Sequence, residues 1–184
     1  MTDTVMGFNG DGWLSGVRRV ITPNCDARPP GADIRLTVIH SISLPPGQFA
    51  GNAIEHLFTN RLDPDAHPYY RELAGLKVSA HFLVRRDGAL IQFVPITTRA
   101  WHAGRSCWRG HLRCNDFSIG IELEGDDTRP FETAQYEKLN LLLGLLAQRF
   151  PAMVVAGHCD IAAGRKTDPG PFFDWHRVVT TSAE

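Results

Sequence analysis

The predicted fold depends most on the sequence Ser118-Ile119-Gly120-Ile121-Glu122-Leu123. This run is short, apolar and partly β-branched, which is typical of a strand buried in a sheet. Its one charged residue is Glu122. Burying a carboxylate costs several kcal/mol unless the group meets a cation, a metal site or another partner. Glu122 is therefore either a functional group or half of a structural salt bridge, and the run by itself leaves both interpretations open.

Further strands are predicted on both sides of this run. Residues 36–40 form an apolar run that ends at His40, and residues 153–156 form another that leads to His158 in a loop rich in glycine and proline. Residues 81–84 and 90–94 flank Asp87-Gly88, which is a strong hairpin signal. The chain thus supplies several short strands that a single sheet can combine.

Helical patterns and loops separate these strands. A short helix is predicted at residues 52–58, a largely buried one from the N-cap Thr133 to Phe150, and a terminal one at residues 174–179. Residues 61–70 contain two prolines and are predicted to form a loop. We therefore expect an α/β fold, with residues 1–184 as a single domain that has a mixed central sheet, helices packed around it and long active-site loops.

Composition limits the classes of partner. The chain is 43% hydrophobic and 21% charged, which suffices for a core, and its net charge of −1 argues against general attraction to nucleic acid or anionic membranes. Residues 1–20 lack the apolar core of a secretory signal, and no run approaches the length of a membrane span. The four cysteines form no CxxC pair and suit reduced thiols. We expect a cytoplasmic monomer without nucleic-acid or membrane partners.

Two histidines and a carboxylate stand at or just after predicted strand ends. His40, His158 and Asp168 are residue types that bind zinc, and three such ligands leave a fourth position open for water. Lys166, two residues before Asp168, is either a solvated charge or a functional cation. The chain has eight histidines, and no compact motif links these three residues. Their spacing alone therefore does not select them as a metal site.

Longer motifs carry a family resemblance over nearly the whole chain. These motifs include Val38-Ile39-His40, Leu62-Asp63-Pro64, Val78-Ser79-Ala80-His81-Phe82, Arg99-Ala100-Trp101-His102-Ala103-Gly104, the run from Cys114 to Gly125, Gly157-His158-Cys159-Asp160, and Arg165-Lys166-Thr167-Asp168-Pro169-Gly170. In these motifs the chain resembles the AmpD-type N-acetylmuramoyl-L-alanine amidases, which belong to the wider zinc amidase and peptidoglycan-recognition superfamily.

The resemblance implies roles for individual residues. It implies Zn²⁺ bound by His40, His158 and Asp168, with Glu122 as the general base. It also implies that Lys166 stabilises the transition state and that Arg113 meets a carboxylate of the substrate peptide. The implied reaction is hydrolysis of the amide between (1,6-anhydro-)N-acetylmuramic acid and L-alanine in muropeptides, during cytoplasmic peptidoglycan recycling.

Two positions depart from the family pattern. Ser41 stands where an asparagine is usual, and Lys77 where an arginine is expected. Serine offers fewer hydrogen bonds than asparagine, and lysine loses the bidentate geometry of arginine, so both changes bear on substrate binding. Trp101 and His102 are expected to line the sugar site, although core packing explains Trp101 equally well. His81 is expected to be a hydrogen-bonded interior residue.

Three other functions compete with this interpretation. An endolysin-like amidase would act on polymeric cell wall, but the sequence has no signal peptide or wall-binding repeat that favours it. A peptidoglycan-binding module without catalysis would be expected to lack a zinc ligand, whereas all three positions are filled. A structural zinc site would need a fourth ligand, for which Cys159 is the nearest candidate. The sequence thus favours an enzyme over a binding or structural protein.

Overall fold

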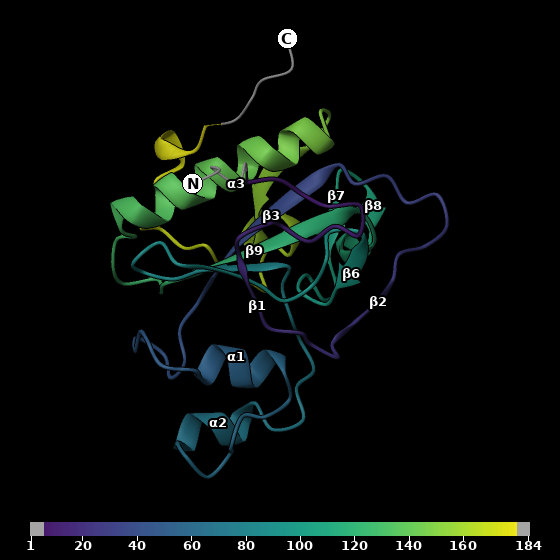
Figure 1. Cartoon of the computed structure of the whole chain (residues 1–184). Helices are drawn as coiled ribbons and strands as arrows, with labels where there is room; N and C mark the ends of the chain where they lie inside the picture. Colours follow the sequence, from purple (N-terminus) through teal and green to yellow (C-terminus); the bar gives the residue numbers. More distant parts are fainter. Residues whose placement is uncertain (1–5, 180–184) are drawn as a thin grey trace.

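A six-stranded mixed sheet forms the centre of the molecule (Figure 1). The computed structural model describes residues 6–179. All neighbouring strands in this sheet run parallel except β4 and β5, which form the predicted hairpin. In spatial order the strands are β1 (Arg18–Arg19), β5 (Leu90–Gln92), β4 (Phe82–Val84), β9 (Ser118–Glu124), β3 (Leu36–Ile42) and β10 (Val154–Gly157). The predicted α/β class with a mixed central sheet is confirmed.

Two small ribbons beside this sheet were not predicted. Strand β2 (Cys25–Ala27) pairs with β6 (Thr98–Ala100), and β7 (Cys107–Trp108) pairs with β8 (His111–Leu112). A 3-10 turn, η1 (Cys114–Phe117), leads directly into β9. Strands of two or three residues are too short to show an alternating pattern, so the sequence contains no signal for them.

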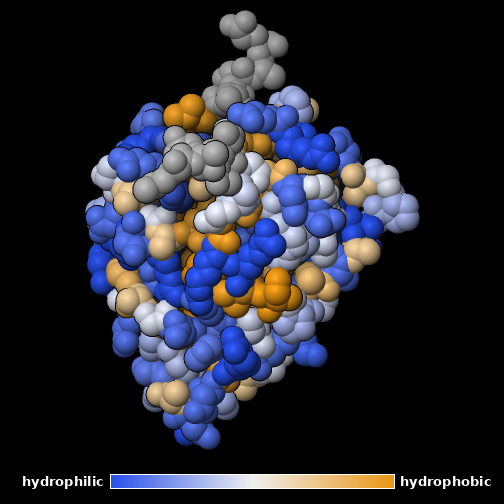
Figure 2. All heavy atoms as spheres, in the orientation of Figure 1, coloured by the Kyte–Doolittle hydropathy of each residue, from blue (hydrophilic) through white to orange (hydrophobic). Residues whose placement is uncertain are grey.

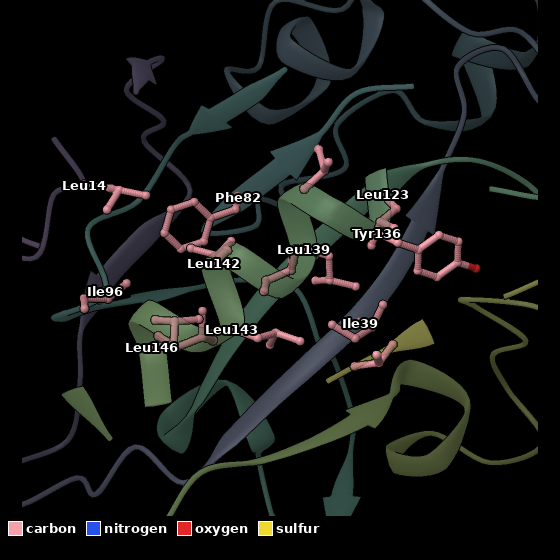
Figure 3. Packing of buried hydrophobic residues seen from close by; sticks show 14 of the residues in the cluster. Leu14, Ile39, Phe82, Ile96, Leu123, Tyr136, Leu139, Leu142, Leu143 and Leu146 are labelled. Carbon is pink, nitrogen blue, oxygen red and sulfur yellow. The ribbon is translucent and has the colours of Figure 1, made fainter. Parts of the chain in front are cut away.

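Helix α3 (Thr133–Arg149) covers one face of the sheet. Figure 3 shows leucines of this helix packed against side chains of the strands beneath it, among them Ile39 and Phe82. The leucines in this contact are Leu139, Leu142, Leu143 and Leu146. Only one side of α3 is buried, because Leu141 on the other side is 44% exposed. The expectation of a largely buried helix was therefore wrong.

The start of α3 also differs from the prediction. Glu132, not Thr133, is the N-cap residue. The Glu132 side chain accepts from the N3 backbone, and the Gln135 side chain accepts from the Glu132 backbone N–H at 3.0 Å. This reciprocal capping box satisfies two N–H groups that a helix start leaves without intrahelical partners, so Glu132 takes the place predicted for threonine.

Three short helices lie on the other face or at the ends of strands: α1 (Ala53–Phe58), α2 (Pro68–Glu72) and α4 (His158–Ile161). The prediction of α1 is confirmed, but residues 61–70 are not wholly a loop. Proline is favourable as the first helical residue, and the His67 side chain caps α2 by accepting from the Tyr69 N–H. His158 likewise begins α4 rather than lying in a loop.

The C-terminal part of the described chain is less regular than predicted. Residues 174–179 contain only the 3-10 turn η2 (Trp175–Arg177), which begins after the cap residue Asp174. Among residues 6–179 no helix is long and apolar enough to span a membrane. Residues 1–5, part of the N-terminal stretch considered for a signal, lie outside the described residues. Figure 2 shows a mostly hydrophilic face with hydrophobic residues reaching the surface near its middle.

Candidate metal centre

The carboxyl ends of β3, β9 and β10 bring the predicted metal and catalytic residues together. His40 on β3 is paired in register with Glu122 on β9, so the two side chains stand next to each other on one face of the sheet. Gly157 at the end of β10 is paired with Ile39, which places the following residue, His158, beside His40. Crevices at the carboxyl ends of parallel strands are a common location for ligand sites.

Three donor atoms form a compact group at this edge. His40 Nδ1, His158 Nδ1 and Asp168 Oδ2 are each 3.0 Å from the other two. Both histidines are buried and Asp168 is half-buried. Zinc binds imidazole nitrogen and carboxylate oxygen at about 2.0–2.2 Å, so one ion can reach all three atoms. The donor set and its spacing fit a zinc ion.

The metal group contains no fourth ligand among residues 6–179. Cys159, the candidate for a closed site, is not part of the group, and its Sγ contacts Asp160 Oδ1 at 3.9 Å. His81 is also excluded, since its Nδ1 accepts from the Gly120 N–H and its Nε2 contacts the Thr98 carbonyl. The prediction of an interior, hydrogen-bonded His81 is confirmed. Three ligands with an open fourth position are typical of catalytic rather than structural zinc.

The loop that carries Asp168 is anchored on both sides. The backbone carbonyl of Asp168 accepts from the Cys159 N–H at 2.9 Å, and the Thr167 hydroxyl donates to Asp127 Oδ2 at 2.6 Å. Gly170 has a φ of +92°, and a Cβ there would also collide with Asp127. These contacts hold the loop against the segment between β9 and α3, so Asp168 is fixed by the fold before any ion binds.

The protonation states of His40 and Asp168 suit metal binding. Burial, together with the nearby His158, lowers the pKa of His40 to about 4 although Asp168 opposes the shift. Burial alone would raise the pKa of Asp168, but hydrogen bonds with His158 and His40 outweigh it, and the pKa falls well below its usual range. Neutral imidazole and ionised carboxylate are the forms that bind a metal ion.

Glu122 lies beside this group and lacks a partner. It is only 9% exposed, and its Oε2 is the one buried side-chain oxygen or nitrogen among the described residues without a hydrogen bond. Burial and then the negative charge of Asp168 raise its pKa well above the usual value, against the opposing charge of Lys166. The alternative of a structural salt bridge finds no support, since Glu122 forms no ion pair with any residue from 6 to 179. A buried carboxyl with a raised pKa and a free oxygen suits proton transfer.

A cleft of about 260 Å³ opens over these residues. Its polar end contains the three metal-binding candidates with Glu122, Lys166, Ser41 and His102. Its opposite wall is apolar and comes from α1, α2 and the segments that follow them: Leu57, Phe58, Tyr69, Leu73, Leu76 and Val78. A polar reactive end beside an apolar wall suits a ligand whose two ends differ in polarity.

Other predicted substrate-binding residues lie away from this cleft. Lys77 is exposed and borders a separate small pocket. The Arg113 side chain is 70% exposed and pairs with Asp116 at 3.2 Å. Trp101 donates its indole N–H to Asp26 Oδ1 at 3.1 Å and does not line the cleft. The structure thus brings Ser41 and His102 to the site but does not bring Lys77, Arg113 or Trp101 into it.

The main contacts of His102 are internal. Its Nδ1 lies 2.9 Å from His40 Nε2, and its Nε2 lies 3.1 Å from Ser118 Oγ. His102 was expected to line the sugar site, and no role was predicted for Ser118. The sequence signal for the packing of His102 against β9 is Gly120, since a Cβ at this position would come within 2.7 Å of the His102 ring. Glycine inside a strand often marks such a close approach.

A larger cleft of about 530 Å³ lies between α1 and the β4–β5 hairpin. Its charged groups satisfy one another, because Glu55 pairs with Arg18 and Arg85, and Arg85 also pairs with Glu124. This cleft therefore offers no unpartnered reactive group, and we assign the chemistry to the smaller one.

Comparisons with known proteins show the family of this chain. The model of the N-acetylmuramoyl-L-alanine amidase family, Amidase_2, matches residues 30–171. The 1,6-anhydro-N-acetylmuramyl-L-alanine amidase AmpD of Citrobacter freundii is 54% identical over 94% of this chain and 95% of its own length. A crystal structure of a selenomethionine AmpD derivative superimposes with a TM-score of 0.91 at 53% identity, covering 94% of this chain and 97% of its own.

A more distant solved structure contains a ligand. It is described as a complex of the Escherichia coli amidase AmiD with the substrate anhydro-N-acetylmuramic acid-L-Ala-D-γ-Glu-L-Lys. It is 31% identical to this chain, with a TM-score of 0.57, and the match covers 92% of this chain and 63% of that one.

These observations define an amidase with a candidate metal site at the carboxyl edge of a mixed sheet. The chain belongs to the N-acetylmuramoyl-L-alanine amidase family. Within that family it is of the AmpD type, as the identity over nearly its whole length and the close structural agreement show.

Proposed function

We propose that this chain is a zinc-dependent amidase that hydrolyses the bond between 1,6-anhydro-N-acetylmuramic acid and L-alanine in muropeptides, and that residues 1–184 form one such domain. The observation that carries the proposal is the group of His40, His158 and Asp168, mutually 3.0 Å apart, beside the unpartnered Glu122. The AmpD relatives are named for this substrate, which supports its assignment over intact cell wall.

The residues of the chain divide the chemistry between them. A zinc ion held by His40, His158 and Asp168 would polarise the amide carbonyl and lower the pKa of the attacking water. Glu122 accepts a proton from that water and returns it to the L-alanine nitrogen as the C–N bond breaks. The products are the lactyl carboxylate of the sugar and an L-alanyl peptide.

Lys166 has an electrostatic role in this proposal. Its side chain lines the same cleft, and its positive charge lowers the pKa of Glu122, which favours the ionised form of that carboxyl. A cation at this position stabilises the negative charge that develops on the carbonyl oxygen, an effect commonly worth roughly 3–4 kcal/mol. The Ser41 hydroxyl lines the cleft and can form a hydrogen bond to the substrate. Arg113, Lys77 and Trp101 would have to act from outside the cleft.

We further propose that the enzyme works in the cytoplasm, in the recycling of cell-wall fragments, and as a monomer. All four cysteines are free, which suits a reducing compartment. Every residue of the candidate site comes from one chain, so a second copy is not needed to complete it.

The test compares soluble and polymeric substrates. The purified enzyme is incubated with anhydro-muramoyl tripeptide or with whole sacculi, and released L-alanyl peptide is measured by mass spectrometry, with Glu122→Gln as the matched control. We expect release from the soluble fragment by the wild-type enzyme alone. Release only from sacculi would contradict the proposed substrate, and equal release by the Glu122→Gln variant would contradict the proposed base.

A further inference from the structure

A chain of hydrogen bonds links the first metal ligand to the backbone outside the cleft. It runs from His40 Nε2 to His102 Nδ1 at 2.9 Å, from His102 Nε2 to Ser118 Oγ at 3.1 Å, and from Ser118 Oγ to the Cys114 carbonyl at 2.6 Å. His40, His102, Ser118 and Cys114 are all buried. Because carbonyl oxygen only accepts hydrogen bonds, the position of every proton along the chain can be worked out from that end.

The Cys114 carbonyl determines the first proton. Only the Ser118 hydroxyl can donate in this contact, and it has a single hydrogen. Ser118 Oγ must then accept from His102 Nε2–H. A neutral imidazole has one N–H, so His102 Nδ1 is an acceptor and receives the Nε2–H of His40. His40 Nδ1 is left with a free lone pair, and it is this atom that lies 3.0 Å from His158 Nδ1 and Asp168 Oδ2.

The backbone around His102 holds the ring in this position. The Asn115 side-chain oxygen accepts from the N–H groups of His102 and Ala103, at 3.1 and 2.8 Å. The ring itself lies against β9 at Gly120, where even one added carbon would collide with it. The ring is therefore fixed by contacts that do not involve a metal ion or a substrate.

We propose that His102 and Ser118 are positioning residues that hold His40 in its Nε2–H tautomer and thereby present His40 Nδ1 to the metal ion. The inference rests on the proposed metal site and goes beyond it. It assigns His102 a role that acts through His40, instead of the predicted contact with the sugar. Mutation of a residue that forms a hydrogen bond with a metal-binding histidine generally lowers metal affinity about 10–100-fold.

We call the hydrogen-bonded series His40–His102–Ser118 the relay. The following variants separate the effect of its hydrogen bonds from the effect of packing. His102→Leu fills the space but leaves the His40 Nε2–H without an acceptor, whereas His102→Asn places an amide oxygen within reach of it. Ser118→Ala removes the acceptor for His102. Thr37→Val is the matched control, because it removes another buried hydroxyl, on β3, that contacts Met153 rather than the relay.

Two measurements test the proposal on the metal-free protein. Zinc affinity is measured by competition with a chelating indicator, and the tautomer of His40 is read from the imidazole ¹⁵N NMR signals. We expect zinc affinity to fall about 10–100-fold in His102→Leu and Ser118→Ala, to recover largely in His102→Asn and to be unchanged in Thr37→Val. The His40 signals are expected to show the Nε2–H form in wild type and a mixture in His102→Leu.

The outcomes distinguish this inference from the proposed function. Wild-type protein that binds no zinc would contradict the proposed metal site, and the inference with it. Tight zinc binding by wild type and by both His102→Leu and Ser118→Ala would contradict the proposed role of the relay but not the metal site. An Nδ1–H tautomer of His40 in the metal-free wild type would have the same meaning. A loss of affinity in Thr37→Val equal to that in Ser118→Ala would reduce the effect to general packing.

Discussion

Glu122→Gln is expected to stabilise the metal-free protein while abolishing its activity. The Glu122 carboxylate is buried and one of its oxygens has no partner, so ionising it in the folded state is unfavourable. An unsatisfied buried group costs about 1–3 kcal/mol, and more when charged. At pH 7.5 we therefore expect the unfolding free energy of the variant to exceed that of wild type by about 1–3 kcal/mol, which corresponds to a rise in Tm of roughly 2–12 °C for a chain of this size.

The raised pKa of Glu122 determines how the unfolding free energy of the wild-type protein changes with pH relative to that of the variant. The pKa of Glu122 is raised in the folded state, so the folded protein keeps a proton that the unfolded chain releases. The stability contributed by this proton is present below about pH 4.5 and is lost as the pH rises toward the folded pKa, with a slope of up to about 1.4 kcal/mol per pH unit. The difference in unfolding free energy between wild type and Glu122→Gln isolates this slope, because the other titrating groups are common to both proteins.

Glu124→Gln is the matched control for this experiment. Glu124 lies two residues further along β9 and is also buried, but it accepts hydrogen bonds from Arg85 and from the Ala50 N–H. Removing its charge should lower stability by about 1.5–3 kcal/mol, since hydrogen bonds to charged groups contribute about this much. Chemical denaturation of the metal-free proteins between pH 5 and pH 8 measures both effects. Parallel stability curves for wild type and Glu122→Gln, or a less stable Glu122→Gln at pH 7.5, would refute the reasoning.

Three further outcomes are expected. His158→Ala should lose bound zinc in metal analysis of the purified protein, with folding retained by circular dichroism, because it removes one of three ligands; a full equivalent of zinc in this variant would rule out the ligand set. Lys166→Ala should lower kcat about 10²–10³-fold with KM changed much less, and Lys166→Arg should recover part of the loss; steady-state kinetics that show only a KM effect would instead make Lys166 a substrate-binding residue. Leu139→Ala, at a fully buried position on the sheet-facing side of α3, should cost about 2–5 kcal/mol of stability. Leu141→Ala, on the exposed side of the same helix, should change stability by less than about 0.5 kcal/mol. Equal effects of the two substitutions in chemical denaturation would contradict the observed packing of α3.

The strands that build the site were predictable from local pattern, but the site itself was not. Residues 36–40 and 118–123 are apolar runs whose period and length indicate buried strands, and the structure confirms both. The three metal-binding atoms come together only because β3, β9 and β10 are neighbours, and spacing along the chain contains no information on that order. The family resemblance, rather than the pattern of residues, selected His40, His158 and Asp168 from the other candidates.

The starts of two helices were predicted wrongly, because side-chain caps decided where these helices begin. Pro68 indicated a loop, yet proline at the first helical position with His67 as cap begins α2. Thr133 is a favourable N-cap residue, but the reciprocal bonds of Glu132 and Gln135 satisfy more backbone groups. The role of His102 was not predicted. Gly120 leaves room for the His102 ring, but the sequence does not show which side chain faces this glycine.

The most direct test of the account is a zinc titration of the metal-free enzyme with anhydro-muramoyl tripeptide as substrate. Release of L-alanyl peptide is followed by mass spectrometry as zinc is added. We predict no release without metal, a rise in rate that saturates at one zinc per chain, and no response in a variant that lacks His40. Full activity in the chelated enzyme, or zinc-dependent activity that survives loss of His40, would contradict the assignment of this site.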